Sequence, residues 1–163
     1  ALPRFSRAIF PAQAVAFSAR SSLASLPAMM ESSRSRLVLP DQITNFFLPL
    51  AASTFRVGGA LGVTTGVVFV AHLYGVALGP VQMASVVLTV ILTTFSVPGI
   101  PGGSIIVMVP VLLAAGVPVE GMGILLGVDT IPDMFRTTAN VTGDMVAATV
   151  LARGESADDA SER

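Results

Sequence analysis

The sequence lacks several of the side chains on which soluble enzymes depend. Its 163 residues include no cysteine, no tryptophan and one histidine, and all nine basic residues are arginine. The lack of cysteine excludes a disulfide scaffold, a thiolate metal site and a cysteine nucleophile. Without lysine there is neither a Schiff base nor a P-loop lysine. The formal net charge of −1 leaves no basic footprint for nucleic acid, which we do not expect as a partner.

Charge is also scarce and unevenly placed. Charged residues make up 12% of the chain, against about 25% in ordinary soluble domains. Residues 57–119 contain no Asp, Glu, Lys or Arg. A helix that spans a bilayer needs about 20 apolar residues, so this stretch has room for two or three crossings. We therefore expect an integral membrane protein in contact with lipid. Short core helices of a soluble protein are the alternative, but the polar residues for a soluble surface are missing.

Interruptions divide the apolar sequence into a repeated pattern. Two short segments broken at residues 20–27 and 96–104 alternate with two longer ones. In residues 1–42 we expect a leading loop (1–10), a first re-entrant hairpin and a polar cytoplasmic loop. A broken transmembrane helix and an outer loop follow in 43–80, and a second re-entrant hairpin in 81–118. A last transmembrane helix in 119–153 and a charged tail in 154–163 complete the chain. Short broken segments at matching places in two halves indicate an inverted-repeat transporter. The predicted fold class is thus an all-α membrane protein.

Arginine placement predicts the orientation of this arrangement. If both hairpins re-enter, one side of the membrane holds Arg4, Arg7, Arg34, Arg36, Arg153 and Arg163, and the opposite loops hold no arginine. The positive-inside rule makes the arginine side cytoplasmic. We expect a multi-pass protein of the inner cell membrane with a cytoplasmic C-terminus.

One polar stripe runs along the last predicted helix. Its members are Asp129, Asp133, Arg136, Asn140 and Asp144. At 100° per residue, their offsets fall within an arc of about 80°. A charged side chain facing lipid at the bilayer centre costs about 2.5–3.5 kcal/mol. The stripe should therefore face a protein interior, where it forms either a binding site or a structural ion-pair network between helices.

The residue types in the stripe suit an acidic amino acid. Arg136 can bind a carboxylate with two parallel hydrogen bonds, and Asp133 can accept from an ammonium group. Asn140 offers both a donor and an acceptor, and the hydroxyls of Ser21 and Ser22 would come from the first hairpin. A serine hydrolase would need a histidine beside its serine, and the single His72 lies near a loop. We therefore expect no enzyme.

These stretches resemble a known family. The segment from Asp133 to Asp144 resembles the last-helix signature of the dicarboxylate/amino acid:cation symporter family, which includes the glutamate transporters. Residues 20–27 resemble its serine-rich first hairpin tip, and residues 100–104 resemble its second. Pro49-Leu50-Ala51-Ala52 with Gly58 is similar to the approach to its unwound seventh helix. The match covers nearly the whole chain in the right order.

The resemblance implies an elevator mechanism, in which the core slides against a trimeric scaffold. The scaffold helices are absent from this chain, which would be a C-terminal core fragment. By resemblance, the substrate amino group goes to Asp133 and its side-chain carboxylate to Arg136. Further substrate contacts are assigned to Thr137, Asn140, Ser21, Ser22, Ile100 and Gly102. Sodium would be coordinated by Asp144 and the backbone carbonyl of Asn140.

One departure from the family affects the coupling ion. The family usually has Asn-Met-Asp-Gly-Thr at the helix break, where this sequence has Phe55-Arg56-Val57-Gly58-Gly59. An Asn and an Asp that bind sodium are lost, and a cation is gained. Our hypothesis is that Arg56 takes the place of a bound cation and pairs with Asp144 or Asp129. Sodium coupling would then be weakened, lost or replaced by protons; no other cofactor is expected.

Several functions remain open at this stage. The first is a symporter for acidic amino acids or dicarboxylates, and retention of both Asp133 and Arg136 favours an amino acid. A second is a sodium-independent or proton-coupled transporter, or a ligand-binding sensor, of the same fold. A third is a purely structural membrane fragment. Stabilisation of the protein by ligand would separate the last from the other two.

Overall fold

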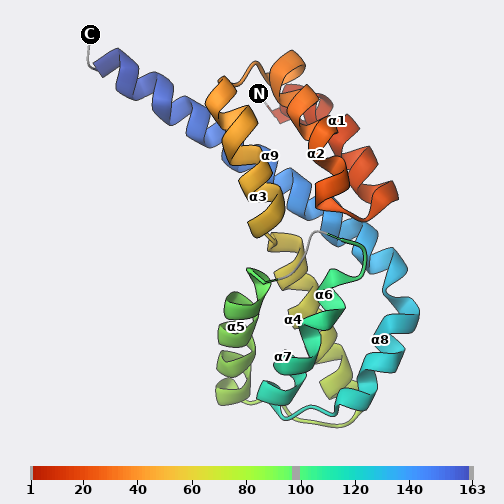
Figure 1. Cartoon of the computed structure of the whole chain (residues 1–163). Helices are drawn as coiled ribbons and strands as arrows, with labels where there is room; N and C mark the ends of the chain where they lie inside the picture. Colours follow the sequence, from red (N-terminus) through yellow and green to blue (C-terminus); the bar gives the residue numbers. More distant parts are fainter. Residues whose placement is uncertain (1, 97–99, 162–163) are drawn as a thin grey trace.

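The computed structural model describes residues 2–96 and 100–161, and the described part of the chain is helical throughout. The helices of the first half are α1 (Leu2–Ala19), α2 (Ser22–Ser32), the π-helices η1 (Ser33–Leu37) and η2 (Ile43–Phe47), and α3 (Leu48–Thr54). Those of the second half are α4 (Val57–Leu73), α5 (Pro80–Thr94), α6 (Gly103–Ile106), α7 (Met108–Ala115), the 3-10 helix η3 (Val119–Gly121) and α8 (Met122–Val128). The long helix α9 (Thr130–Ser161) runs along both halves (Figure 1).

The N-terminal segment differs from the expected loop. Residues 2–10 belong to α1, which continues through Pro11 to Ala19. Ala8, Ile9, Ala12 and Ala16 form a buried face of this helix. Packing of that face stabilises the helix despite the proline, which is why local sequence signals gave the wrong prediction here. The chain turns at Arg20, which has a left-handed φ of 52°, and α2 begins at Ser22.

The predicted polar loop at 31–42 is also shorter than expected. Helical structure continues through η1 to Leu37 and resumes at Asp41, so that residues 38–40 make the connection. The hydroxyls of Ser33 and Thr44 form a buried hydrogen bond of 2.7 Å across this connection. That bond satisfies two polar groups which would otherwise be buried without partners.

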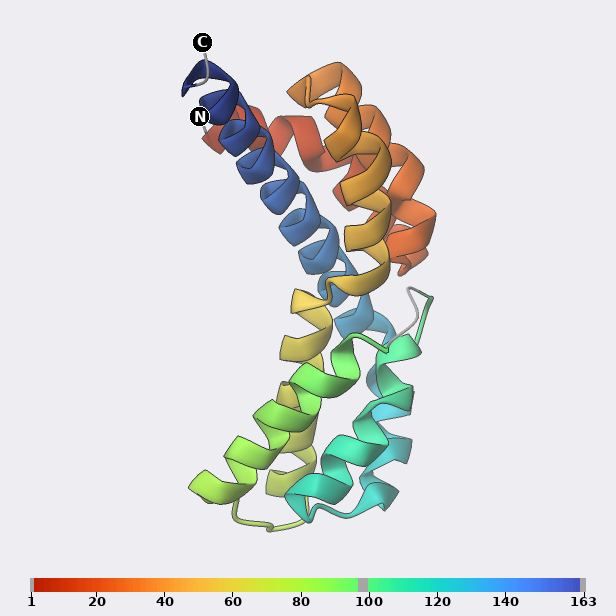
Figure 2. The ribbon, with the colours of Figure 1, turned by 60° about the vertical axis from the view of Figure 1, so that its left-hand side comes forward.

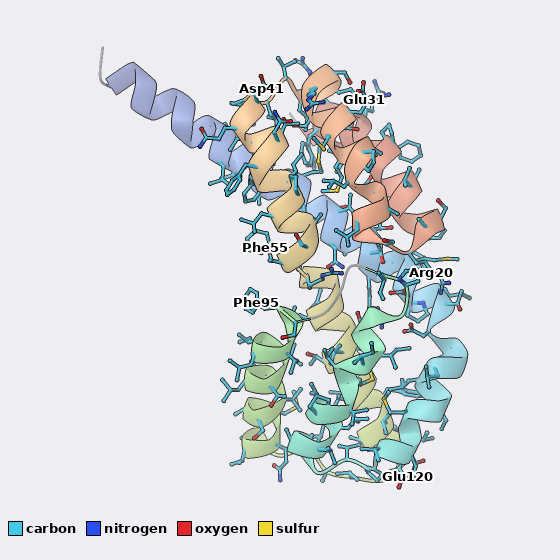
Figure 3. All side chains as sticks on the ribbon, in the orientation of Figure 1. Arg20, Glu31, Asp41, Phe55, Phe95 and Glu120 are labelled. Atoms are coloured by element: carbon cyan, nitrogen blue, oxygen red, sulfur yellow. The ribbon has the colours of Figure 1, made fainter. Side chains whose placement is uncertain are left out.

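The predicted break in the long helix of residues 43–78 is confirmed. Helix α3 ends at Thr54, Phe55 and Arg56 are not helical, and α4 begins at Val57. By length and composition, the helix from Ile43 to Leu73 could cross a membrane. Figure 3 shows Phe55 at the point where the two parts join.

The last segment is divided where one helix was expected. Helix α8 ends at Val128, and α9 begins at Thr130 and extends to Ser161, well into the predicted tail. Pro132 lies in the first turn of α9, where its missing N–H costs nothing because that turn has no intrahelical acceptor. Asp129 keeps helical φ and ψ between the two helices, and Pro132, which cannot donate to Val128, interrupts the backbone hydrogen bonding at this point.

Two separate apolar cores organise the molecule. The first joins α1, α2 and η2 to the C-terminal part of α9, through side chains such as Ile9, Met29 and Met145. The second joins α4, α5 and α7, through side chains such as Val67, Val86 and Leu112. Figures 1 and 2 show the two halves end to end, with the α1–α2 turn and the beginning of α6 near the middle. The buried charged residues lie between the two cores.

Candidate functional site

The polar stripe of the last segment is buried, as predicted. Asp129, Asp133, Arg136, Asn140 and Asp144 are each 1–9% exposed, whereas Ile131 and Phe135 on the other face are 65% and 63% exposed. In a membrane helix, charged side chains normally face the protein interior, where they have partners, and apolar side chains face the lipid. The stripe therefore faces the interior, and its partners identify what it can bind.

Arg136 is the centre of a charged cluster. Its Nη2 atom donates to Oδ1 of Asp129 and, at 3.2 Å, to Oδ1 of Asp133. Among the described residues these are the ion pairs that the structure contains. One guanidinium thus balances two carboxylates, which leaves the cluster with an excess negative charge. Such a cluster can accept a further cation.

Asn140 connects α9 to the broken helix. Its Oδ1 accepts from the backbone N–H of Gly58 at 2.8 Å and of Gly59 at 3.3 Å. These amides are in the first turn of α4, where a helix has no acceptors of its own. The side chain of Asn140 is therefore a cap from another helix, and the break at Phe55 and Arg56 is what makes the two amides available.

A column of glycines lets α4 approach α9 closely. A Cβ atom at Gly58 would lie 2.1 Å from the backbone oxygen of Arg136, and one at Gly62 would lie 1.9 Å from its Cδ. The third glycine, Gly66, faces α7 instead, because a Cβ atom there would lie 2.9 Å from Cε of Met108. Sequence reasoning missed this contact, although the four-residue spacing of small residues is the usual signal for close helix packing in membranes.

The second hairpin reaches the cluster through Gly102. Its backbone N–H donates to Oδ2 of Asp133 at 3.3 Å. Gly102 has a left-handed φ of 73° and directly precedes α6. Ile100, the other candidate from this tip, is 52% exposed. Residues 97–99 of the expected tip lie outside the described residues.

The first hairpin contributes a serine turn. Oγ of Ser21 accepts from the N–H of Ala24 and caps α2, so Ser21 has a local structural partner. Ser22 is buried, and its hydroxyl has no hydrogen-bond partner among the described residues. Figure 3 shows Arg20 at this turn, and its Nη1 donates to Thr130 at 3.5 Å. Both tips therefore contact the first turns of α9.

Thr137 shares the burial of the stripe, being 4% exposed. It follows Asp133 by four residues on α9, one turn along the same side of the helix. Most of the candidate substrate residues are thus buried, namely Arg136, Asp133, Thr137, Asn140, Ser21 and Ser22, whereas Gly102 is half-buried and Ile100 is exposed.

Arg56 does not form the direct ion pair that we expected. It is 7% exposed, so it points into the protein and not into lipid. Its Nε and Nη2 atoms have no hydrogen-bond partner within the described part of the chain, and the same holds for Oδ2 of Asp144. Asp144 and Asp133 are nevertheless the charges that act on Arg56. Asp129 forms its ion pair with Arg136 instead.

An apolar cavity of about 520 Å³ adjoins the cluster on the other side of Arg136. It lies between α4 and the α8–α9 junction, and its walls include Phe69, Leu125 and Phe135. Asp129 and Arg136 are the charged residues in its lining. No sequence pattern predicts this cavity, because its walls come from residues about 60 positions apart that only the fold brings together.

Comparison with known proteins identifies the lineage. The sodium:dicarboxylate symporter family matches residues 2–154. The chain is 36% identical over 141 residues to the proton/glutamate-aspartate symporter of Escherichia coli (strain K12), covering 86% of this chain and 32% of that protein. It is 34% identical over 141 residues to the proton/sodium-glutamate symport protein of Bacillus caldotenax, covering 86% and 33%.

A more distant relative lies in mammals. The chain is 32% identical over 147 residues to excitatory amino acid transporter 2 of Mus musculus, covering 90% of this chain and 26% of that protein. The chain thus spans about a third or less of the length of these relatives. The resemblance seen in its hairpin tips and last helix is confirmed, and the family consists of symporters, not enzymes. The chain belongs to the sodium:dicarboxylate symporter family.

Proposed function

We propose that this chain is the substrate-binding core of a secondary active transporter for acidic amino acids. The observation that carries the proposal is the buried cluster of Asp129, Asp133 and Arg136 between two apolar cores. A symporter of this family has to hold an anionic substrate away from lipid. The names of the relatives, which include glutamate and aspartate symporters, support this substrate class.

The ion pairs of the cluster suggest how a zwitterion binds. The carboxylate of the substrate side chain takes the place of Asp133 at the guanidinium of Arg136, while Asp129 continues to hold that guanidinium. The substrate ammonium then becomes the partner of Asp133. The ion pair between Arg136 and Asp133 is exchanged for one ion pair from each of these residues to the substrate, so that both buried charges keep a partner. A plain dicarboxylate has no ammonium for Asp133, and it therefore binds more weakly.

The remaining polar groups complete the site in this proposal. The unpartnered hydroxyl of Ser22 and the amides of the first tip donate to the second carboxylate of the substrate. Thr137, Ser21 and Ile100 contribute further contacts. When Asp133 turns to the ammonium, the amide of Gly102 exchanges its bond to Asp133 for a shorter one to the bound substrate. Asn140 acts mainly through the α4 cap that its side chain makes.

The placement in the membrane belongs to the same proposal. The two hairpins re-enter from opposite sides as an inverted repeat, and the core moves in an elevator-type transport cycle. The scaffold against which it moves comes from segments outside this chain, in a homotrimer. The arginine-rich end and the C-terminus face the cytoplasm at the inner cell membrane.

A second form of the proposal concerns the coupling ion. A buried guanidinium acting on Asp144 supplies a fixed positive charge where a sodium ligand set would need a bound cation. Phe55 and Val57 offer no side-chain oxygen to sodium. We therefore favour a sodium-independent or proton-coupled transporter, or a sensor of the same fold, over a sodium symporter. Asp144 and the Asn140 carbonyl are the ligands that sodium would use if coupling persists.

The substrate assignment is tested by two substitutions with different selectivity. Arg136→Lys keeps the charge but loses the planar fork, and we expect at least a tenfold loss of affinity for both aspartate and succinate. Asp133→Asn should weaken aspartate binding about tenfold or more and leave succinate binding unchanged or improved. Binding is measured by isothermal titration on the purified protein, and thermal unfolding checks that each variant is folded. Equal losses for both ligands in Asp133→Asn would contradict the assignment.

The coupling ion is tested by a sodium titration of aspartate binding. We expect an affinity that changes less than twofold between sodium and choline buffers. Restoration of family residues at the break, as Phe55→Asn with Arg56→Met and Val57→Asp, should make binding depend on sodium. A strong sodium dependence in the unaltered protein would refute the role of Arg56 and leave the substrate assignment intact.

A further inference from the structure

We propose that an arginine-lined cavity at the far end of the first half binds the phosphate headgroup of an anionic phospholipid. The cavity has a volume of about 1010 Å³. Its walls come from the beginning of α1, the connection after η1 and the C-terminal part of α9. The beginning of α1 and the connection after η1 lie at the opposite end of that half from the α1–α2 turn (Figure 1). The cavity that they line is therefore separate from the proposed substrate site.

Charge is the first argument for an anionic ligand. Arg4, Arg34, Arg36 and Arg153 line the cavity, and Asp41 is the one acidic residue among them. None of the four arginines forms an ion pair within the described residues. Arg34 donates to the neutral amide of Asn45. The four arginines are exposed and share this wall with a single carboxylate, so an anionic phosphate that accepts hydrogen bonds from their guanidinium groups offsets their mutual repulsion.

The apolar part of the lining argues for a lipid over a soluble phosphate. Phe5, Leu37, Val38 and Leu39 share the walls with the arginines. Val38 is 77% exposed and has a left-handed φ of 54°, a conformation that is unfavourable for a β-branched residue. A lipid offers contacts to both parts of this lining, because its phosphate meets the arginines and its glycerol and first methylenes meet the apolar side chains.

The position along the chain agrees with a membrane interface. Within the described residues, the one candidate span begins at Ile43, two residues after Asp41 of the cavity wall. The headgroups of a bilayer lie at the ends of its spanning helices. Basic pockets between helices at the cytoplasmic surface are typical sites for anionic headgroups. By the positive-inside rule, the end of the molecule that holds these arginines is also the end expected to face the cytoplasm.

The test measures lipid binding to the purified protein in detergent micelles, with Arg7→Gln as a matched control. Arg7 is exposed on the same helix as Arg4 but does not line the cavity. We expect phosphatidylglycerol to raise the unfolding temperature and to bind in native mass spectrometry, and phosphatidylcholine to do neither. Arg4→Gln and Arg36→Gln should each lower phosphatidylglycerol affinity about fivefold, while Arg7→Gln leaves it unchanged.

Three outcomes would overturn the proposal. Equal stabilisation by the two lipids would show that the charge of the headgroup is not recognised. An equal loss of affinity in Arg7→Gln would show general attraction to a basic end and not a site. Stabilisation by glycerol 3-phosphate at the concentration at which phosphatidylglycerol acts would identify a soluble phosphate as the ligand.

Discussion

The turn of the first hairpin is stabilised by hydrogen bonds among its own residues, whereas the described part of the second tip donates a hydrogen bond to a residue of the binding cluster. At the first turn, Ser21 caps α2 and its carbonyl accepts from the hydroxyl of Ser25 at 2.8 Å. At the second, α6 has no side-chain cap, and Gly102 donates to Asp133 at 3.3 Å. A change at Asp133 therefore acts directly on the second tip, through its bond to Gly102.

The two hairpins also differ in how much of their apolar surface is buried. Helix α1 buries Ala8, Ile9, Ala12 and Ala16. Helix α5 buries Val86 and Val90, and leaves exposed Val81, Val87, Leu88, Ile91 and Leu92. We infer that the first hairpin is a fixed wall of the proposed site and that the second is the part which ligand binding moves. Three substitutions test this difference and the contact between α4 and α9 on which both halves depend.

The largest effect is expected at Gly58. A Cβ atom there would lie 2.1 Å from the backbone oxygen of Arg136, and neither backbone can move without separating the two halves. We expect Gly58→Ala to lower the free energy of unfolding by about 3 kcal/mol or more, measured by thermal or denaturant unfolding in detergent. Gly123→Ala is the matched control, because nothing lies within 4 Å of a Cβ atom at that position. A similar small effect of both would mean that α4 does not pack this closely.

A smaller effect on stability, with a larger effect on binding, is expected at Gly62. A Cβ atom there would overlap the Cδ atom of Arg136, which is part of a flexible side chain and can move. We expect Gly62→Ala to cost about 1–2 kcal/mol of stability and to lower aspartate affinity at least tenfold, because the guanidinium is displaced from Asp133. Calorimetric titration measures the affinity. Unchanged affinity in a folded variant would argue against a role for this guanidinium.

The sequence predicted those parts of the fold that periodicity and charge determine. The burial of the stripe from Asp129 to Asp144 followed from its narrow arc and from the cost of a charge in lipid. The break at Phe55 and Arg56 followed from the small residues around it. Both features are local in sequence, and therefore a single helix or turn contains all the information that is needed.

The rest depended on contacts between distant residues. The helical start of α1 comes from packing of its alanine face, which no local signal encodes. Among the described residues Arg56 forms no ion pair with Asp129 or Asp144, because whether a guanidinium reaches a carboxylate on another helix is decided in three dimensions. The cap from Asn140 to Gly58 joins residues that are 82 positions apart, and no spacing within one helix could have predicted it.

The smallest effect is expected at Ser21, and it compares the two tips directly. Ser21→Ala removes the oxygen that accepts from the N–H of Ala24, and we expect it to destabilise the first turn by about 1 kcal/mol and to increase hydrogen exchange of the Ala24 amide about fivefold. Ser18→Ala is the control, because its exposed hydroxyl bonds only within α1. Aspartate should slow exchange at Gly102 and leave exchange at Ala24 as it was. If aspartate instead protects the two amides equally, the first hairpin moves with the second, and the difference drawn between a fixed wall and a moving one is wrong.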